Sequence, residues 1–503
     1  MEQNNNYSQP WQGGAEVPPQ PRQAPMFPAG RKELWFAGVM LLCGLAQANF
    51  VLFGGFNLGF SVAAAACICV SVGYLMISGR KLGAYSATLF VLSLVIAAGF
   101  ARSDDGFVKF VMVCFLLLAV NLGLSLLAGQ NRWTAAGIRS LLEAPSVFFG
   151  FSLGKLPESL RGLSVTFKNG GAASKKTSAV LLGLVIAVPL LIVVILLLVS
   201  ADAAFAGLVE KLPDFDFPQL IWTVLLGTGV ACVFYSRGAA LLHSPKTEAT
   251  ATSRKGIHPL TVNTVLIVVC IVYLVYLFSQ TAYFVGGFAG ILPEGFTMAE
   301  YARRGFFEMG WLCAINLGII AFAVGLVEKT GKTPLLTRVL CLFIGVVTLF
   351  FVVTASAKMG MYIASYGLTR LRVLTEVVMI FLGLATATVC VWLFVPKLPY
   401  MKVVLLLALV MGAAVIWADV DTVVASYNVR AYQSGKLDAV DVEYLTTLSA
   451  GAVPYIAELA EDGSETAKRF MEEYGSAHYW DGNFDDLRSW NWTDWLAGKA
   501  WER

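Results

Sequence analysis

The chain has 503 residues, of which 57% are hydrophobic and 14% charged, and its mean hydropathy is +0.70. This composition differs from that of soluble globular domains and predicts a multi-pass membrane protein. The formal net charge of +3 conceals an asymmetry, because the segment from Asp419 onward carries 16 acidic and 7 basic residues. A basic membrane part with an acidic tail indicates opposite sides of a bilayer and argues against nucleic-acid binding.

Residues 1–33 are rich in Asn, Gln, Pro and Gly, and we expect a disordered cytoplasmic leader there, without a cleaved signal peptide. After the leader, runs of about 20 apolar residues predict helices that cross a membrane. We place eleven such spans near 34–53, 56–77, 83–101, 107–128, 178–199, 218–240, 260–283, 305–327, 335–357, 371–395 and 400–418. The expected fold is an all-α, polytopic transmembrane helical bundle.

The charges of the loops orient these spans. Basic residues concentrate in the loops that follow even-numbered spans, which predicts a cytoplasmic N-terminus. Eleven crossings then place the C-terminus outside the cell. The chain divides into the leader 1–33, a four-helix membrane region 34–128, a basic interfacial cytoplasmic segment 129–177, a seven-helix membrane core 178–418 and an acidic, Trp-rich tail 419–503.

Two of these segments are not predicted to cross the membrane. Segment 129–177 mixes basic and aromatic residues, which is typical of helices lying over anionic lipid, although a site for a cytoplasmic partner is an alternative. Segment 419–503 predicts a small helical extracytoplasmic module. Its tryptophans favour docking on lipid headgroups, with aromatic binding of a glycan or peptide as the alternative.

Sequence patterns for catalysis and metal binding are missing. The nine cysteines lie in apolar runs, where small packing residues are expected, and the three histidines have no zinc-ligand spacing. Gly331-Lys332-Thr333 resembles the end of a phosphate loop, but Leu326 occupies the position that needs the first glycine. We therefore expect no catalytic residues, no metal site and no cofactor.

The stretch TMAEYARRGFFEMGWLCAIN, from Thr297 to Asn316, places charges at the start of an apolar helix. Thr297 and the glutamate three residues later have the spacing of a capping box. Arg304 and Glu308, four residues apart, can then lie on one helical stripe. Charges inside a membrane segment are costly and are by default functional.

Further charges are predicted at the same depth in the next two spans. Lys358 is expected at the outer end of one span, while Glu376 lies about one turn inside the other and can pair with Arg372. The loop positions of these cations break the positive-inside pattern. The candidate substrate-binding residues are Tyr301, Arg303, Arg304, Glu308, Lys358, Arg372 and Glu376.

Two interpretations of this layer remain open. In the first, the cations extend outward, carboxylates neutralise them and tyrosines form an interfacial belt, so that the layer is structural. In the second, the layer is an outward-opening polar vestibule that binds an anionic headgroup, phosphate or carboxylate, with Glu308 or Glu376 as a proton carrier. Asn121, Asn263, Gln280 and Asn316 either extend this polar path or join helices by hydrogen bonds.

Four sequence runs resemble a known family: EGFTMAEYARRGFFEM (Glu294 to Met309), SADAAF (Ser200 to Phe205), SYNVRAY (Ser426 to Tyr432) and RSWNW (Arg488 to Trp492). They are similar to a bacterial family of integral membrane proteins catalogued as domain of unknown function 4173. The resemblance covers most of residues 130–492 and implies a multi-pass protein of the bacterial plasma membrane. It implies no activity.

The leading functional hypothesis is an outward-facing transport protein, or one that handles lipids or anions, with anionic membrane lipids as partners. The alternative is a non-catalytic envelope sensor or scaffold that holds a protein partner through 419–503. An intramembrane enzyme is the third hypothesis, and the missing motifs argue against it.

Overall fold

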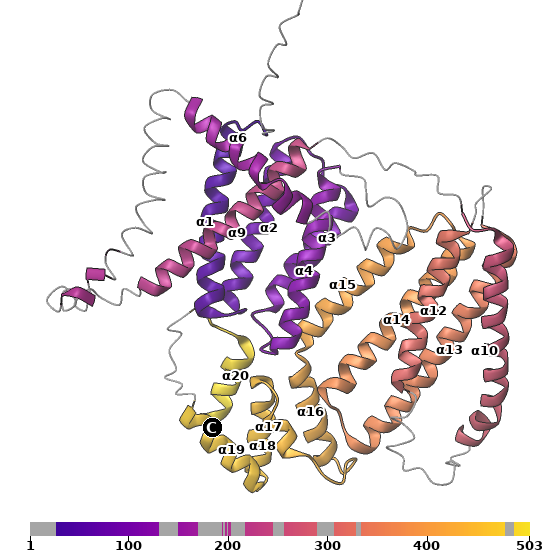
Figure 1. Cartoon of the computed structure of the whole chain (residues 1–503). Coiled ribbons are helices and arrows are strands. Elements are labelled where there is room, and N and C mark those ends of the chain that lie inside the picture. The colour runs from indigo at the N-terminus through magenta and orange to yellow at the C-terminus, as the bar shows by residue number, and fades with distance from the viewer. Residues whose placement is uncertain are drawn as a thin grey trace, which may run out of the picture.

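The computed structural model describes residues 27–129, 149–169, 217–244, 256–288, 306–327, 333–477 and 487–502, with a few positions between 194 and 202. Every regular element in these ranges is helical (Figure 1). The only extended pairing among them is an isolated parallel bridge between Ile257 and Val327. The expectation of an all-α protein is confirmed for the described residues.

Nine described helices are long and apolar enough to cross a membrane. They are α1 (Arg31–Gly54), α2 (Leu58–Ile77), α4 (Gly106–Leu127), α9 (Phe217–His243), α10 (Pro259–Phe288), α12 (Phe306–Leu326), α13 (Leu335–Tyr366), α14 (Arg370–Phe394) and α15 (Tyr400–Ala418). A shorter apolar helix, α3 (Ala84–Gly99), coincides with the third predicted span. Most of the predicted span 178–199 lies outside the described residues, so the number of crossings stays a prediction.

Two helix ends differ from the sequence expectation. Helix α1 begins at Arg31, inside the predicted leader. Helix α13 continues to Tyr366, beyond the predicted end at 357, so Lys358 lies within the helix. The charge of Lys358 interrupts the apolar run, but the backbone does not turn until Gly367, which has a φ of 72°. Glycine adopts that conformation without steric cost, so it ends the helix.

The membrane-type helices pack in two groups that do not follow chain order (Figure 1). Helices α1–α4 share a buried core with α9 and α15, which includes Met40, Leu89 and Ile416. Helices α10, α12, α13 and α14 enclose a second core around Phe351 and Met379. Helix α13 packs against the other three helices of that group.

Helices α1 and α9 of the first group approach each other closely at a pair of glycines. A Cβ atom added to Gly44 would lie 2.4 Å from the carbonyl oxygen of Gly227, and one added to Gly227 would lie 2.8 Å from the Cα of Leu45. Small residues at helix crossings let backbones approach closely, and the resulting van der Waals contacts help to hold membrane helices together. The pair Gly44 and Gly227 therefore sets the distance between α1 and α9.

We expect Gly44→Ala to force α1 and α9 apart and to cost at least about 1 kcal/mol of stability. Thermal unfolding of the purified protein in detergent measures this loss. Gly38→Ala is the matched control, because a Cβ atom at Gly38 of the same helix meets no atom within 4 Å. Equal melting temperatures for the two variants would contradict the expectation.

Five short helices, here called the C-terminal helices, follow α15: α16 (Val420–Gln433), α17 (Val442–Thr446), α18 (Val453–Glu461), α19 (Glu465–Ala477) and α20 (Trp492–Trp501). They have a small core of their own, formed by residues such as Val429 and Ile456. They lie at one end of the bundle, and α6 (Leu156–Asn169) lies at the other (Figure 1).

Helices on both sides of the boundary between the bundle and the C-terminal helices begin at a polar capping side chain. Asp105 precedes α4 and accepts hydrogen bonds from the backbone N–H groups of Phe107 and Val108, at 2.9 and 3.0 Å. Asp419 caps α16 in the same way. Such side chains satisfy amide groups that a helix start leaves without partners. Capping thus brings carboxylates to the boundary between the bundle and the C-terminal helices.

The residues before α20 fasten it to the bundle through the main chain. The Leu58 and Gly59 amides donate to the carbonyls of Trp490 and Arg488, each at 3.1 Å, and the Trp492 amide donates to the Ala101 carbonyl at 2.9 Å. This part of the predicted Trp-rich ending is therefore a docking segment for α2 and α3. Whether other tryptophans contact headgroups stays a prediction.

Candidate functional site

The structure describes four of the seven candidate residues. Tyr301, Arg303 and Arg304 lie outside the described residues. Glu308 is near the start of α12, Lys358 is in α13, and Arg372 and Glu376 are in α14. Helices α12 and α14 begin, and α13 ends, at the end of the bundle that carries the C-terminal helices (Figure 1), so all four residues lie toward that end.

Glu308 and Glu376 lie at nearly the same depth. Helices α12 and α14 begin at the same end of the bundle (Figure 1), and a Cβ atom at Gly310 would lie 3.6 Å from the sulfur of Met379. Glu308 precedes Gly310 by two residues and Glu376 precedes Met379 by three. At a rise of about 1.5 Å per residue, the two glutamates differ in depth by about 1.5 Å.

The two glutamates do not share a face. Glu308 is exposed, like its neighbour Phe307 and like Trp311, whose exposed fraction is 72%. Glu376 is three residues before the buried Met379, which places it on the side of α14 that approaches α12. Glu308 therefore points outward from the bundle and Glu376 points toward its neighbours.

Arg372 does not form the expected pair with Glu376. Its Nη1 atom donates to the Tyr366 carbonyl at 3.1 Å and to the Gly367 carbonyl, and its guanidinium carbon lies 4.1 Å from the centre of the Tyr362 ring. Carbonyls at a helix C-terminus have no partners within the helix, and a cation there is favourable. Arg372 thus fixes the end of α13 instead of neutralising Glu376.

Glu376 and Lys358 are both partly buried and lie on the neighbouring helices α14 and α13. The Oε2 atom of Glu376 is buried and makes no hydrogen bond within the described residues. Lys358 is half-buried, eight residues before the end of α13, and Glu376 is six residues after the start of α14. Since these helices run antiparallel, the two residues are about 12 and 9 Å from the turn that joins them.

The polar residues deeper in the second group join helices. The Tyr273 hydroxyl donates to the side-chain oxygen of Asn316 at 2.5 Å, and the Asn316 amide donates to the Thr348 hydroxyl at 2.9 Å. The Thr337 hydroxyl likewise donates to Asn263, at 2.7 Å. Asn316, Thr348 and Thr337 are fully buried. These residues match the interhelical alternative, whereas the Gln280 side chain lies outside the described residues.

In the first group, Asn121 also joins helices. Arg237 of α9 donates to the side-chain oxygen of Asn121 and to the Ser125 hydroxyl, the latter at 2.8 Å. Both α4 residues and Arg237 are buried. The arginine stacks on Phe151 at 5.5 Å, which ties segment 149–169 to the bundle. Asn121 therefore holds a buried cation in place.

The sequence interpretation missed the strongest charge cluster, which we call the junction cluster: Asp104, Asp105, Lys109, Arg370, Asp419, Asp421 and Asp494. Its centre is Arg370, the first residue of α14. The Nε atom of Arg370 lies 2.8 Å from Oδ1 of Asp421, to which it donates, and 2.9 Å from Oδ2 of Asp105. The side chains of Asp105 and Asp421 are 1% and 0% exposed. One guanidinium thus joins α4, α14 and α16.

Two further aspartates of the junction cluster, Asp419 and Asp494, are at least partly buried without the direct contact to Arg370 that Asp105 and Asp421 have. Asp419 accepts hydrogen bonds from the hydroxyls of Ser103 and Thr422, and burial raises its pKa above the ordinary value. Burial, with the nearby charge of Asp104, raises the pKa of Asp494 to about 7. Lys109 lies 3.3 Å from Asp104 and lowers the pKa of Asp494 in part. With a pKa of about 7, the carboxyl of Asp494 can gain or lose a proton near neutral pH.

The sequence did contain a signal for this cluster. Asp104 and Asp105 lie between two predicted spans and Asp419 follows the last one, but none of the three was among the candidate residues. Within the described ranges, no group of three or more His, Cys, Asp or Glu side chains is placed to hold a metal ion. The aspartates of the cluster are instead directed to Arg370, Lys109, hydroxyls and helix N-termini.

Comparison with known proteins identifies a family for this chain. A family model described as Domain of unknown function (DUF4153) matches residues 36–459. No curated protein and no solved structure matches the chain. The match supports the expectation of an uncharacterised family but not the number 4173.

Proposed function

Since the chain belongs to the family described as Domain of unknown function (DUF4153), which assigns no activity, we propose its function from the geometry of α12–α14. We propose a multi-pass protein of the bacterial plasma membrane, with its N-terminus in the cytoplasm, that transports or handles anionic lipids or solutes. The observation that supports this proposal is the buried Oε2 atom of Glu376, which accepts no hydrogen bond from any residue that the structure describes.

A carboxylate inside a membrane helix is costly, and among the described residues none donates a hydrogen bond to its buried Oε2 atom that would offset that cost. Lys358 lies at a similar depth on the neighbouring helix and is a strong donor for phosphate or carboxylate oxygens. We assign Lys358 to the bound anion and Glu376 to the proton or ion that accompanies it. Tyr301, Arg303 and Arg304 belong to the proposed outer rim, with Arg372 fixing the turn beside it.

The test measures binding of phosphatidylglycerol to the purified protein by native mass spectrometry. Lys358→Met is expected to weaken binding about tenfold, the effect of losing about 1.4 kcal/mol of ion pairing. Glu376→Gln is expected to strengthen binding, because it removes a carboxylate that repels the phosphate. Glu308→Gln is the matched control, since Glu308 lies at the same depth but on the exposed face.

Two results would contradict this assignment. Unchanged binding in both Lys358→Met and Glu376→Gln would show that the anion does not reach this layer. An equal effect of Glu308→Gln and Glu376→Gln would show that only the general surface charge matters.

A second function, an envelope sensor or scaffold, is favoured by a different observation. Arg370 joins the C-terminal helices to both helix groups, so a partner held by those helices can act on α4 and α14. A photo-crosslinker in place of the exposed Tyr432 on α16 tests this in cells. A discrete protein adduct supports the sensor, and its absence supports the transport proposal.

A further inference from the structure

The turn between α13 and α14 is held by side chains of the C-terminal helices. The amide of Leu368, in the middle of this turn, donates to Oδ1 of Asn428 at 2.7 Å. The Nδ2 atom of Asn428, a buried residue of α16, donates back to the Leu368 carbonyl at 2.8 Å. Backbone groups that leave the helical pattern need partners of this kind. One asparagine thus satisfies both backbone groups of Leu368.

The contacts on either side of Leu368 are equally specific. A Cβ atom added to Gly367 would lie 2.5 Å from Oδ1 of Asn428, so the backbone and the amide approach as closely as glycine allows. On the other side, the Arg370 amide donates to the hydroxyl of Tyr444 in α17 at 2.8 Å. Hydrogen bonds of this length are directional and tolerate displacements of only about 0.5 Å. The turn is therefore held at one place on α16 and α17.

Helix α14 depends on this turn more than its neighbour does. Among the described residues, the side-chain hydrogen bonds from α14 to other elements come from Arg370 and Arg372, in its first turn. Helix α13 is also joined to α12 at a deeper level, where the Asn316 amide donates to the Thr348 hydroxyl. Farther along, α14 packs through apolar side chains such as Met379.

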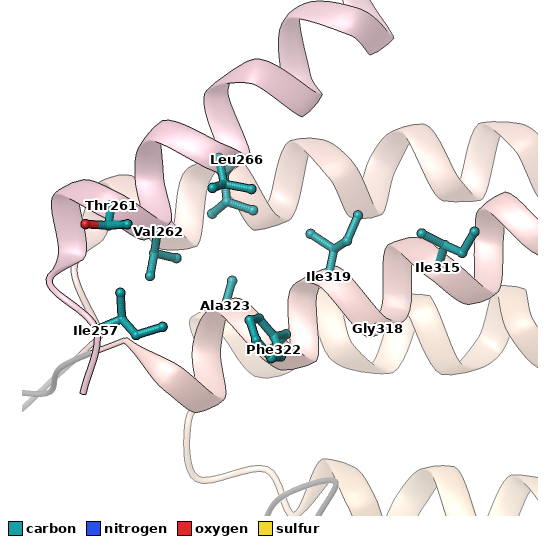
Figure 2. A pocket seen from close by; sticks show the side chains of 10 residues that line it. Ile257, Thr261, Val262, Leu266, Ile315, Gly318, Ile319, Phe322 and Ala323 are labelled. Carbon is teal, nitrogen blue, oxygen red and sulfur yellow. The ribbon is translucent and has the colours of Figure 1, made fainter. Parts of the chain in front are cut away.

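Apolar packing by itself leaves room in this group of helices. Away from the C-terminal helices, α10 and α12 are separated by an apolar groove with a volume of about 410 Å³ (Figure 2). Leu266 and Phe322 are among the residues that line it, and the Thr261 hydroxyl is the only polar side-chain group of the lining. Such contacts have no preferred direction, so they do not select one rotation of a helix. The polar contacts at the turn therefore fix the rotation of α14.

Lys358 and Glu376 lie close enough to the turn to respond to it. They are about 12 and 9 Å from it along their helices. A rotation of α14 by about 20° moves the tip of a side chain, at a radius of about 6 Å, by about 2 Å. This displacement is larger than a hydrogen bond to a bound oxygen tolerates. The place of Glu376 relative to Lys358 thus depends on the contacts at the turn.

We propose that Asn428 is a positioning residue for Lys358 and Glu376, and that the C-terminal helices thereby set the affinity of this layer for anions. The inference rests on the proposed function of the layer. Helix α16 is itself fixed to the first helix group, since the Ser103 hydroxyl donates to Asp419 at 2.8 Å. The C-terminal helices thus align the charged residues of the second group with the first group.

Asn428→Asp tests this inference, because it keeps the acceptor for the Leu368 amide and removes the donor to the Leu368 carbonyl. Binding of phosphatidylglycerol to the purified protein, measured by native mass spectrometry, is expected to weaken about fivefold. The loss is smaller than in Lys358→Met, since the cation is displaced but not removed. Tyr444→Phe adds no charge, is expected to weaken binding about twofold, and keeps the test valid if Asn428→Asp does not fold.

Asn491→Asp is the matched control. Asn491 is also buried, and its Nδ2 atom donates to the carbonyls of Phe100 and Ser103 at 3.2 and 2.9 Å. The substitution adds the same charge and removes the same kind of hydrogen bond, but at the first helix group. It is expected to lower the melting temperature and to bind phosphatidylglycerol like the wild type. An equal loss of binding in Asn428→Asp and Asn491→Asp would overturn the inference.

Combining Asn428→Asp with Lys358→Met shows whether Asn428 acts through the cation. The double variant is expected to bind like Lys358→Met alone, because the position of an absent side chain no longer matters. Independent effects would multiply to about fiftyfold and would overturn the inference. Unchanged binding in both Asn428→Asp and Tyr444→Phe would also overturn it, while the proposed function would stand if Lys358→Met still weakened binding. No effect of Lys358→Met would overturn both.

Discussion

Arg370→Met is expected to loosen the C-terminal helices from the bundle and to lower stability by about 3 kcal/mol. The substitution leaves Asp105 and Asp421 buried without their cation, and breaking a buried ion pair from one side is strongly destabilising. We place the expected value at the lower end of that range because the Arg370 side chain itself is 34% exposed. Thermal unfolding in detergent and proteolysis of 420–477 measure the effect.

Arg372→Met is the control for this prediction, because Arg372 lies two residues later and contacts carbonyls and a ring rather than carboxylates. It is expected to cost about 1 kcal/mol or less. Adding Asp421→Asn to Arg370→Met should restore part of the lost stability, since it removes one uncompensated charge. If both arginine variants unfold alike, the guanidinium of Arg370 does not hold the junction together.

The stability of the protein is expected to fall as pH rises from about 4 to about 7, in part through Asp494. Burial raises the pKa of Asp494 from 3.8 in the unfolded chain to about 7 in the folded protein. The folded state therefore binds more protons than the unfolded state in this window, so this contribution is present below pH 4 and is lost by pH 7. The half-buried position reduces the expected size to about 2 kcal/mol.

Asp494→Asn tests this, because the amide stays neutral at every pH. The variant should be more stable than the wild type at pH 8, and the difference should shrink toward pH 4, as measured by melting temperature. A smaller fall with rising pH should persist in the variant, because the pKa of Asp419 is also raised. The control is Asp438→Asn at an exposed position. A wild type and variant with parallel pH profiles would contradict the role of Asp494.

The sequence was sufficient to predict the class of fold and the positions of most of the described helices. Apolar runs that are long enough to cross a bilayer leave few alternatives, because a backbone in hydrocarbon must satisfy its hydrogen bonds within a helix. The predicted ends fail where they depend on a single charge. Lys358 was expected to end a span, but the helix continues to Tyr366 because only Gly367 changes the backbone direction.

For the candidate site, too, the sequence was sufficient for some features and the tertiary structure was needed for others. Sequence spacing was sufficient to put Glu308 and Glu376 at one depth, because depth follows from the rise per residue along a helix. Only the tertiary structure decided that Glu308 faces outward and Glu376 faces α12, since the facing side depends on which helices pack together. It also brought Arg370 to Asp105 and Asp421, which are 265 residues before it and 51 after it in the chain. No local pattern encodes such pairs, because packing of distant helices creates them.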